Sequence, residues 1–140
     1  KHAFGFVFET EDEKAVISGD TKYCPALIEA AKGADVLLHE VFIHGEMPLT
    51  AGLRTAKTVE NVASYHTLDS VVGKVATEAE VSCLMLTHFA PPKFDREKLL
   101  STVSKDFKGT VLIGEDLMTI DLERNSLSWK KMQIAFAALD

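Results

Sequence analysis

Two short, almost wholly apolar runs constrain the fold of this 140-residue chain more than any other feature. Val36-Leu37-Leu38 ends in His39-Glu40, and Cys83-Leu84-Met85-Leu86 ends in Thr87-His88. Apolar runs of this length without alternating polar residues are typical of buried parallel strands. With helices predicted between and after them, the two runs indicate an α/β fold.

Further elements are predicted on both sides of these strands. Residues 3–9 and 14–18 are expected to form a hairpin with a charged tip. Helices are expected from Pro25 to Gly33, from Leu68 to Ala79 with Thr67 as N-cap, and from Asp95 to Phe107. Residues 41–58, which carry Gly45, Pro48 and Gly52, are expected to be a long loop. Three closing strands are predicted at 110–114, 117–122 and 126–130.

The charge and composition exclude several classes of protein. The net charge is −6 and no segment concentrates basic residues, so a nucleic-acid partner is not expected. The apolar runs are far shorter than the roughly 18 residues of a membrane-spanning helix. Cys24 and Cys83 lie far apart with no paired motif, so two free thiols are expected, and this cysteine usage favours the cytoplasm.

Titratable side chains follow three of the predicted strands. Asp20 follows the second strand, Glu40 the third and His88 the fourth, while His66 precedes a predicted helix. Carboxyl ends of strands share one edge of an open α/β sheet, where ligands bind. The nitrogen and oxygen atoms of such a cluster suit divalent zinc, manganese or iron. Each residue also has an ordinary alternative, because Asp after a strand is commonly a turn residue and His is commonly structural.

Four ordered motifs carry a resemblance to a known family. They are Ser18-Gly19-Asp20-Thr21, the run from Gly33 to Glu40, Tyr65-His66-Thr67, and Leu86-Thr87-His88-Phe89. From about Ala3 to Asp121 the chain resembles the C-terminal half of the metallo-β-lactamase superfamily, in its ribonuclease Z and arylsulfatase-like branch. The resemblance implies one half of a four-layer αββα sandwich, a mixed β-sheet with flanking helices, so that residues 1–140 would form part of a single domain.

The resemblance also implies roles for four residues. Asp20 matches the carboxylate that bridges two metal ions, and His88 matches a ligand of the second ion. His66 matches the histidine that helps to protonate the leaving group, and Glu40 resembles the acidic residue that orients it. His39 is expected to be structural. The implied cofactor is a pair of divalent metal ions, most simply zinc.

The chain departs from the family pattern in two ways. The signature His-x-His-x-Asp-His, which supplies most metal ligands of the family, is absent from these 140 residues. We therefore expect half an active site, weak metal binding by this chain alone, and an apolar sheet face covered by a second copy or by an N-terminal half. Secondly, Phe89-Ala90-Pro91-Pro92 follows His88, which resembles the arylsulfatase-like or phosphodiesterase members.

The expected function is that of a metal-dependent hydrolase acting on a small phosphodiester, sulfate ester or related ester, represented by an incomplete chain that is inactive alone. One alternative is a non-catalytic fragment or degenerate half-domain that self-associates. A further alternative is a ribonuclease Z-type endonuclease that processes transfer-RNA 3′ ends.

Overall fold

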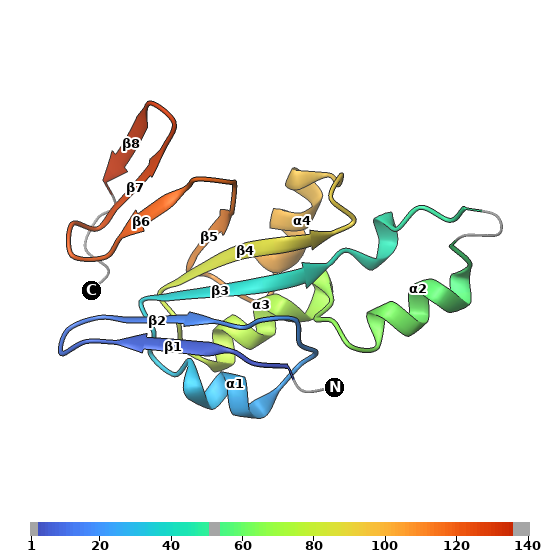
Figure 1. Ribbon diagram of the computed structural model, residues 1–140, viewed down its shortest axis with the longest axis horizontal. Helices are drawn as coiled ribbons and strands as arrows, with labels where there is room; N and C mark the ends of the chain where they lie inside the picture. Colours follow the sequence, from blue (N-terminus) through green and yellow to red (C-terminus); the bar gives the residue numbers. More distant parts are fainter. Residues whose placement is uncertain (1–2, 51–53, 136–140) are drawn as a thin grey trace.

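A five-stranded mixed sheet forms the centre of the molecule. The structure is a computed structural model that describes residues 3–50 and 54–135. The strands lie in the order β1-β2-β3-β4-β5, with β1 antiparallel to β2 and the other pairs parallel (Figure 1). Their bounds are β1 Phe6–Glu9, β2 Lys14–Ile17, β3 Val36–Phe42, β4 Cys83–Ala90 and β5 Thr110–Ile113. The predicted α/β class and the mixed sheet are confirmed.

Helices cover one face of this sheet. They are α1 (Pro25–Ala30), α3 (Asp69–Glu78) and α4 (Arg96–Val103). Leu37 and Leu84 project from the two central strands into the main core, where they pack with Val72 and Val75 of α3 and Leu99 of α4. Fully burying a side chain such as Val75 stabilises the fold by about 1.5–3 kcal/mol. This core fixes α3 against the sheet and therefore fixes the segment that precedes α3.

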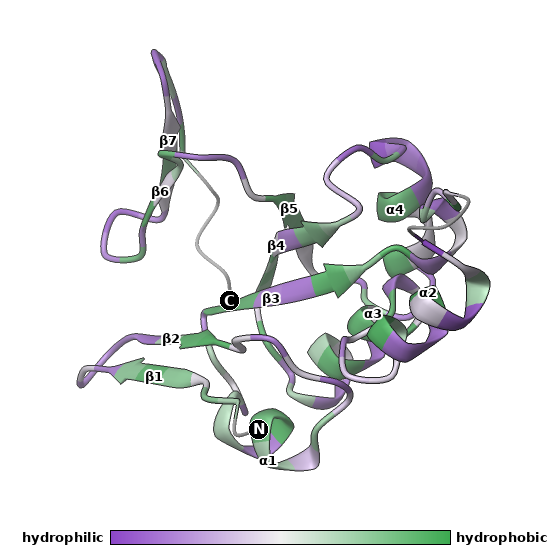
Figure 2. Cartoon of the chain, turned by 45° about the vertical axis from the view of Figure 1, so that its right-hand side comes forward, coloured by the Kyte–Doolittle hydropathy of each residue, from purple (hydrophilic) through white to green (hydrophobic). Residues whose placement is uncertain are grey.

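The opposite face of the sheet is partly open. Val36, Cys83 and Met85 form a small second core there. On the same face, at the edge strand β1, Phe6 and Phe8 pair with Ile17 and Ala15 but stay 57% and 59% exposed. Figure 2 shows β1 and most of β2 in the colour of apolar residues. Within the described residues, part of the apolar face of the sheet is therefore left uncovered.

A small antiparallel sheet lies beside the open face. It consists of β6 (Thr119–Asp121), β7 (Ser126–Trp129) and β8 (Met132–Ala135) in that order. Met118, Ile120 and Leu122 pack against the second core. This sheet covers only part of the face, and it lies away from the helices (Figure 1).

Several predicted bounds were wrong. The segment 41–58 is not a single loop, because β3 continues to Phe42, a 3₁₀ turn spans His44–Glu46, and α2 spans Ala56–Ala63. The start of α2 is fixed by Thr55, whose side chain accepts a hydrogen bond from the N–H of Thr58. Residues 51–53 of the predicted loop lie outside the described residues. Strand β8 had not been predicted, because the apolar residues Met132 and Ile134 are half exposed on a short hairpin.

Candidate metal and proton-transfer site

Asp20 lies in a sharp turn directly after β2. The preceding residue, Gly19, has a φ of +62°, and a Cβ atom there would lie 2.2 Å from the carbonyl oxygen of Phe4. Only glycine fits this combination of left-handed backbone and close approach. The turn is also tied to the sheet, since the N–H of Ser18 donates to the carbonyl oxygen of Leu38 at 2.9 Å. The backbone that carries Asp20 is thereby fixed at the carboxyl edge of the sheet.

His88 is positioned by a β-bulge in β4. Glu40 pairs with Thr87 and Val41 pairs with Phe89, so His88 is an additional residue between two ladder pairs. Its φ is +46°, in the left-handed region that a histidine adopts infrequently. A bulge lets a strand turn a side chain out of the regular alternation, and bulges are common beside active sites. His88 is thus 59% exposed on a strand whose first four residues are buried.

Asp20 and His88 face each other at this edge. Oδ1 of Asp20 lies 3.4 Å from Nε2 of His88, and each side chain is 59% exposed. Two ligands of a tetrahedral zinc ion, each about 2.0–2.1 Å from the metal, lie about 3.3 Å apart. The oxygen and nitrogen atoms therefore fit two positions of one metal shell. Among the described residues, no group of three or more His, Cys, Asp or Glu side chains is arranged to hold a metal ion.

Glu40 and His66 form a buried pair next to these two residues. Nδ1 of His66 lies 3.1 Å from Oε2 of Glu40, and their side chains are 8% and 2% exposed. When the Glu40 carboxylate is ionised it has only acceptor atoms, and Nδ1 of His66 is then the donor of this contact, with Nε2 left for other partners. Burial raises the pKa of Glu40, and hydrogen bonds from Thr67 and His66 oppose that rise.

Ring contacts of His66 place the buried Glu40–His66 pair beside the exposed Asp20–His88 pair. The His66 ring stacks near Phe42, with centroids 5.9 Å apart, and near His88, with centroids 6.1 Å apart and planes 25° apart. All four predicted site residues therefore lie together: Asp20 with His88, Glu40 with His66, and His66 beside His88. The arrangement places two candidate metal ligands beside a candidate proton donor or acceptor.

Thr67 holds the site together, although the sequence suggested another role for it. It was predicted to be an N-cap, but the N-cap of α3 is Leu68. The N–H of Thr67 donates to Oε1 of Glu40 at 2.7 Å, and its hydroxyl donates to the carbonyl oxygen of Thr21 at 2.7 Å. Its carbonyl oxygen accepts from the N–H of Phe42 at 2.8 Å. The position of Thr67 directly after His66 was the only feature of the sequence that pointed to a role in the site.

Two other histidines lie outside this cluster. His39 is fully buried, and its Nδ1 contacts the carbonyl oxygen of Glu40 at 2.7 Å. Burial lowers the pKa of His39 to about 4, although the backbone contact opposes the change. Nε2 of His44 lies 2.8 Å from Oε1 of Glu60 on α2, at the surface. Neither side chain contacts Asp20 or His88 among the interactions of the described residues.

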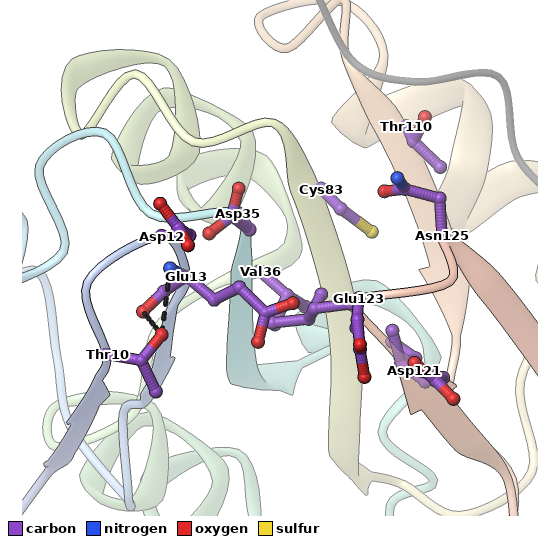
Figure 3. Close-up of a pocket in the computed structure, with 12 residues that line it drawn as sticks. Thr10, Asp12, Glu13, Asp35, Val36, Cys83, Thr110, Asp121, Glu123 and Asn125 are labelled. Atoms are coloured by element: carbon purple, nitrogen blue, oxygen red, sulfur yellow. Dashed lines mark hydrogen bonds between the residues drawn. The ribbon is translucent and has the colours of Figure 1, made fainter.

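Another cavity lies at the opposite end of the strands. It has a volume of about 530 Å³, and Figure 3 shows Asp12, Glu13 and Asp35 around one side of it and Asp121 and Glu123 around the other. Val36 and Cys83 begin β3 and β4 there, whereas the site residues lie at the ends of these strands. This cavity therefore has no part in the chemistry of the Asp20–His88 edge.

Known proteins resemble the chain in both sequence and fold. No family model matches it. It is 34% identical over 110 residues to ribonuclease Z of Myxococcus xanthus, covering 78% of this chain and 33% of the relative. It is 28% identical over 123 residues to a putative ribonuclease Z of Mycobacterium tuberculosis, covering 84% of this chain and 52% of the relative. The chain thus spans between a third and about half of the length of these relatives.

A solved structure shows the same fold. The metallo-β-lactamase fold protein YhfI from Bacillus subtilis superposes with a TM-score of 0.61 at 21% identity, covering 79% of this chain and 41% of that protein. The architecture is therefore that of a metallo-β-lactamase fold protein. In sequence the chain resembles ribonuclease Z proteins, and in fold it resembles a metallo-β-lactamase fold protein, so both comparisons support the metallo-β-lactamase superfamily in the branch that contains ribonuclease Z. No helix within the described residues is long and apolar enough to cross a membrane.

Proposed function

We propose that this chain carries one part of the active centre of a metal-dependent hydrolase that cleaves phosphodiester, sulfate ester or related ester bonds. The observation that carries the proposal is the juxtaposition of two pairs of different chemistry. The exposed Asp20 and His88 lie 3.4 Å apart, and the buried Glu40–His66 pair lies beside them. The names of the curated relatives and the metallo-β-lactamase fold support the same class of reaction.

In this proposal Asp20 and His88 hold metal and His66 handles a proton. Divalent metal, when bound, supplies a hydroxide at neutral pH and polarises the ester oxygen. Glu40 accepts a hydrogen bond from Nδ1–H and fixes the His66 ring. In the imidazolium form of His66, Nε2 also carries a proton, which it gives to the leaving oxygen, and the ring is left neutral with its hydrogen on Nδ1. Thr67 keeps the Glu40 carboxylate in place through its N–H. Proton donation of this kind contributes about 100- to 10,000-fold to a rate.

Metal content tests the ligands. The chain is stripped with chelator, dialysed against zinc and analysed by elemental mass spectrometry, alongside Asp20→Asn, His88→Ala and the control His44→Ala. Because the chain lacks the His-x-His-x-Asp-His motif, we expect weak zinc binding by the wild type and the control, and still less zinc in the two ligand variants. Measurable zinc that is equal in all four proteins would contradict the assignment of Asp20 and His88. A stoichiometry near two would mean that the chain or its oligomer supplies further ligands.

Turnover tests the role of His66. In a protein completed with an N-terminal half that carries the His-x-His-x-Asp-His motif, we expect hydrolysis of a small ester. His66→Ala should keep its zinc and lower kcat by about 100- to 10,000-fold, whereas His44→Ala should leave kcat unchanged. If His66→Ala turned over like the wild type, His66 would not be the proton donor. If the completed protein bound zinc without hydrolysis, the alternative of a non-catalytic, self-associating half-domain would replace the proposal.

We also propose that a further layer covers the open sheet face, supplied by the remaining half of the fold or by a second copy of this chain. The support is the exposure of Phe6 and Phe8 beside the small second core. Contiguous exposed apolar surface of this kind marks an interface. Sedimentation of the purified chain tests whether a second copy covers the sheet face. If the chain stays monomeric at high concentration, the remaining half of the fold is the covering layer that this proposal retains.

Processing of transfer-RNA 3′ ends is a second candidate function, favoured by the names of the relatives. It requires binding to a polyanion, which the net charge of −6 opposes. The discriminating experiment compares cleavage of a precursor transfer RNA with cleavage of a small phosphodiester by the completed protein. Preference for the RNA, with a steep loss of binding as salt rises, would favour this candidate.

A further inference from the structure

The hydroxyl of Ser18 joins the Asp20 turn to the end of β3. Oγ of Ser18 donates to the carbonyl oxygen of Gly19 at 2.7 Å and accepts from the N–H of Glu40 at 3.2 Å. Ser18 is 4% exposed and Glu40 is 1% exposed. A serine hydroxyl has one donor and two acceptor positions, so both bonds form at the same time. One buried oxygen atom therefore links the turn before Asp20 to the residue that holds His66.

This hydroxyl takes the place of a ladder bond of the sheet. The N–H of Ser18 donates to the carbonyl oxygen of Leu38 at 2.9 Å, in the pattern of a parallel pair. The next N–H on that side of β3 is that of Glu40, and it donates to the side chain of Ser18, because the chain turns away after β2. A buried N–H without an acceptor costs as much as a lost hydrogen bond. The side chain of Ser18 satisfies this N–H at the point where the turn begins.

Thr67 anchors the other side of the same turn. Its hydroxyl donates to the carbonyl oxygen of Thr21, and its N–H donates to Oε1 of Glu40, each at 2.7 Å. Asp20 therefore lies between two anchored carbonyl oxygens, those of Gly19 and Thr21. Both anchors lead to Glu40, one to its N–H and the other to its carboxylate. These bonds and the chain between them form a closed ring that passes through the backbone of Asp20.

The direction of the Asp20 side chain depends on this ring. The side chain is 59% exposed, and the contact found for it among the described residues is the one with His88 at 3.4 Å. The backbone that carries it must then limit the directions that it can take. Removing hydrogen bonds that orient a metal ligand from behind typically weakens metal binding by about 10- to 100-fold.

We propose that Ser18 is a positioning residue for Asp20, and that it acts as one unit with Thr67 through Glu40. This inference rests on the proposed hydrolase function, in which Asp20 is a metal ligand. The ring is closed only when both hydroxyls are present, so removal of either one releases the turn. Glu40 thereby orients the candidate metal ligand as well as the candidate proton donor.

Hydrogen exchange of backbone amides tests the coupling without any metal. In the ¹⁵N-labelled chain, Ser18→Ala removes the acceptor of the Glu40 N–H and should speed its exchange by about 5- to 150-fold. It should also speed exchange at Thr67, whose N–H is linked to Ser18 through Glu40. Ser18→Thr keeps the hydroxyl and should restore both rates. The N–H of Gly114, which donates to the carbonyl oxygen of Leu86, reports on the sheet as a whole and should keep its rate.

The matched control is Ser126→Ala, because Ser126 is also buried, at 6% exposure, but lies in β7. It should leave exchange at Glu40 and Thr67 unchanged. An unchanged rate at Thr67 in Ser18→Ala would overturn the coupling. Equal acceleration at Gly114 would overturn it too, since the substitution would then only destabilise the fold.

The direction of Asp20 is measured in the same metal-free samples. Scalar couplings of its β protons should indicate one rotamer in the wild type and averaged rotamers in Ser18→Ala and in Thr67→Val. Averaged couplings in the wild type would overturn the positioning role, because the ring would then not direct the side chain.

Zinc titrations followed by NMR complete the test. We expect Ser18→Ala and Thr67→Val each to weaken zinc binding by about 10- to 100-fold, and the double variant to weaken it no further than the weaker-binding single variant. If the two effects multiplied, the hydroxyls would act independently and the proposed unit would be overturned. If the wild type bound no zinc while the exchange and coupling results held, the hydrolase function would fail and the positioning of Asp20 by Ser18 would stand.

Discussion

The hydroxyl of Thr67 donates to the carbonyl oxygen of Thr21 at 2.7 Å, and so joins two segments 46 residues apart in sequence. Thr21 follows the metal-ligand candidate Asp20, and Thr67 follows the proton-transfer candidate His66. The same threonine binds the carboxylate of Glu40 through its N–H. One buried residue therefore sets the distance between the two functional halves of the site.

Removal of this hydroxyl should loosen the site. Thr67→Val keeps the shape of the side chain but leaves the carbonyl oxygen of Thr21 without its donor. Such a loss costs about 1–3 kcal/mol for a buried group, and we expect the lower end of this range because Thr21 is half-buried. Thr67→Ser keeps the donor and should retain more of the stability. Urea unfolding of the three proteins measures the effect. Equal unfolding free energies for Thr67→Val and the wild type would show that the bond contributes nothing.

Gly19 and Gly33 provide a matched pair for the turn before Asp20. Their φ values are +62° and +66°, but a Cβ at Gly19 would lie 2.2 Å from the carbonyl oxygen of Phe4, while nothing lies within 4 Å at Gly33. Gly33→Ala should cost about 1–2 kcal/mol for the left-handed backbone alone. Gly19→Ala should cost clearly more and also reduce zinc retention. Similar costs in thermal or urea unfolding would mean that the turn relaxes without strain.

His39 should make the stability depend on pH. Burial lowers its pKa to about 4 in the folded chain, whereas an unfolded histidine titrates near 6.5. Between these values the unfolded chain binds a proton that the folded chain does not, so the free energy of unfolding is fully retained above about pH 6.5 and falls as the pH falls, by up to about 1.4 kcal/mol per unit. Urea unfolding from pH 7.5 to 4.5 measures this slope.

The comparison of His39→Leu with His44→Leu isolates that contribution, because His44 is exposed and paired with Glu60. We expect a shallower slope for His39→Leu and the wild-type slope for His44→Leu. An unchanged slope in His39→Leu would assign the pH dependence to other groups.

The two free cysteines should differ in reactivity. Cys83 is 7% exposed, and burial raises the pKa of its thiol to about 11, while Cys24 is only partly buried before α1. Since the thiolate is the reactive form, iodoacetamide at neutral pH should modify Cys24 first. Peptide mass spectrometry at successive times measures the order, and urea should remove the difference. Faster modification of the folded Cys83 would indicate that the small second core opens.

Much of the central sheet could be predicted because its strands carry unbroken apolar runs. Val36, Leu37 and the run from Cys83 to Leu86 are buried, and Leu38 is partly buried on the open face of the sheet. Short unbroken apolar runs of this kind predict central strands. The two ends of these strands were harder to predict. The pairing of Phe42 with Leu68 and the extra residue at His88 depend on contacts between segments distant in sequence.

The four site residues could be placed at one edge of the sheet, since the carboxyl ends of neighbouring parallel strands meet there. Their fine geometry could not be predicted. Helix α2 was missed because its apolar side chains are few, and Val59 is its one buried residue. The bonds of Thr67 to Glu40 and Thr21 were hidden because a threonine before a helix is ordinarily a cap.

The position of His88 depends on the bulge in β4, whereas the pairing of β3 with β4 does not. Glu40 and Val41 already pair with Thr87 and Phe89, so removal of His88 alone would restore an uninterrupted ladder between β3 and β4. Phe89 would keep its place against the main core. A single-codon deletion would therefore remove the Asp20–His88 pair and leave the sheet intact, and the reverse insertion would restore it. Gain and loss of this pair in such a chain need only one step.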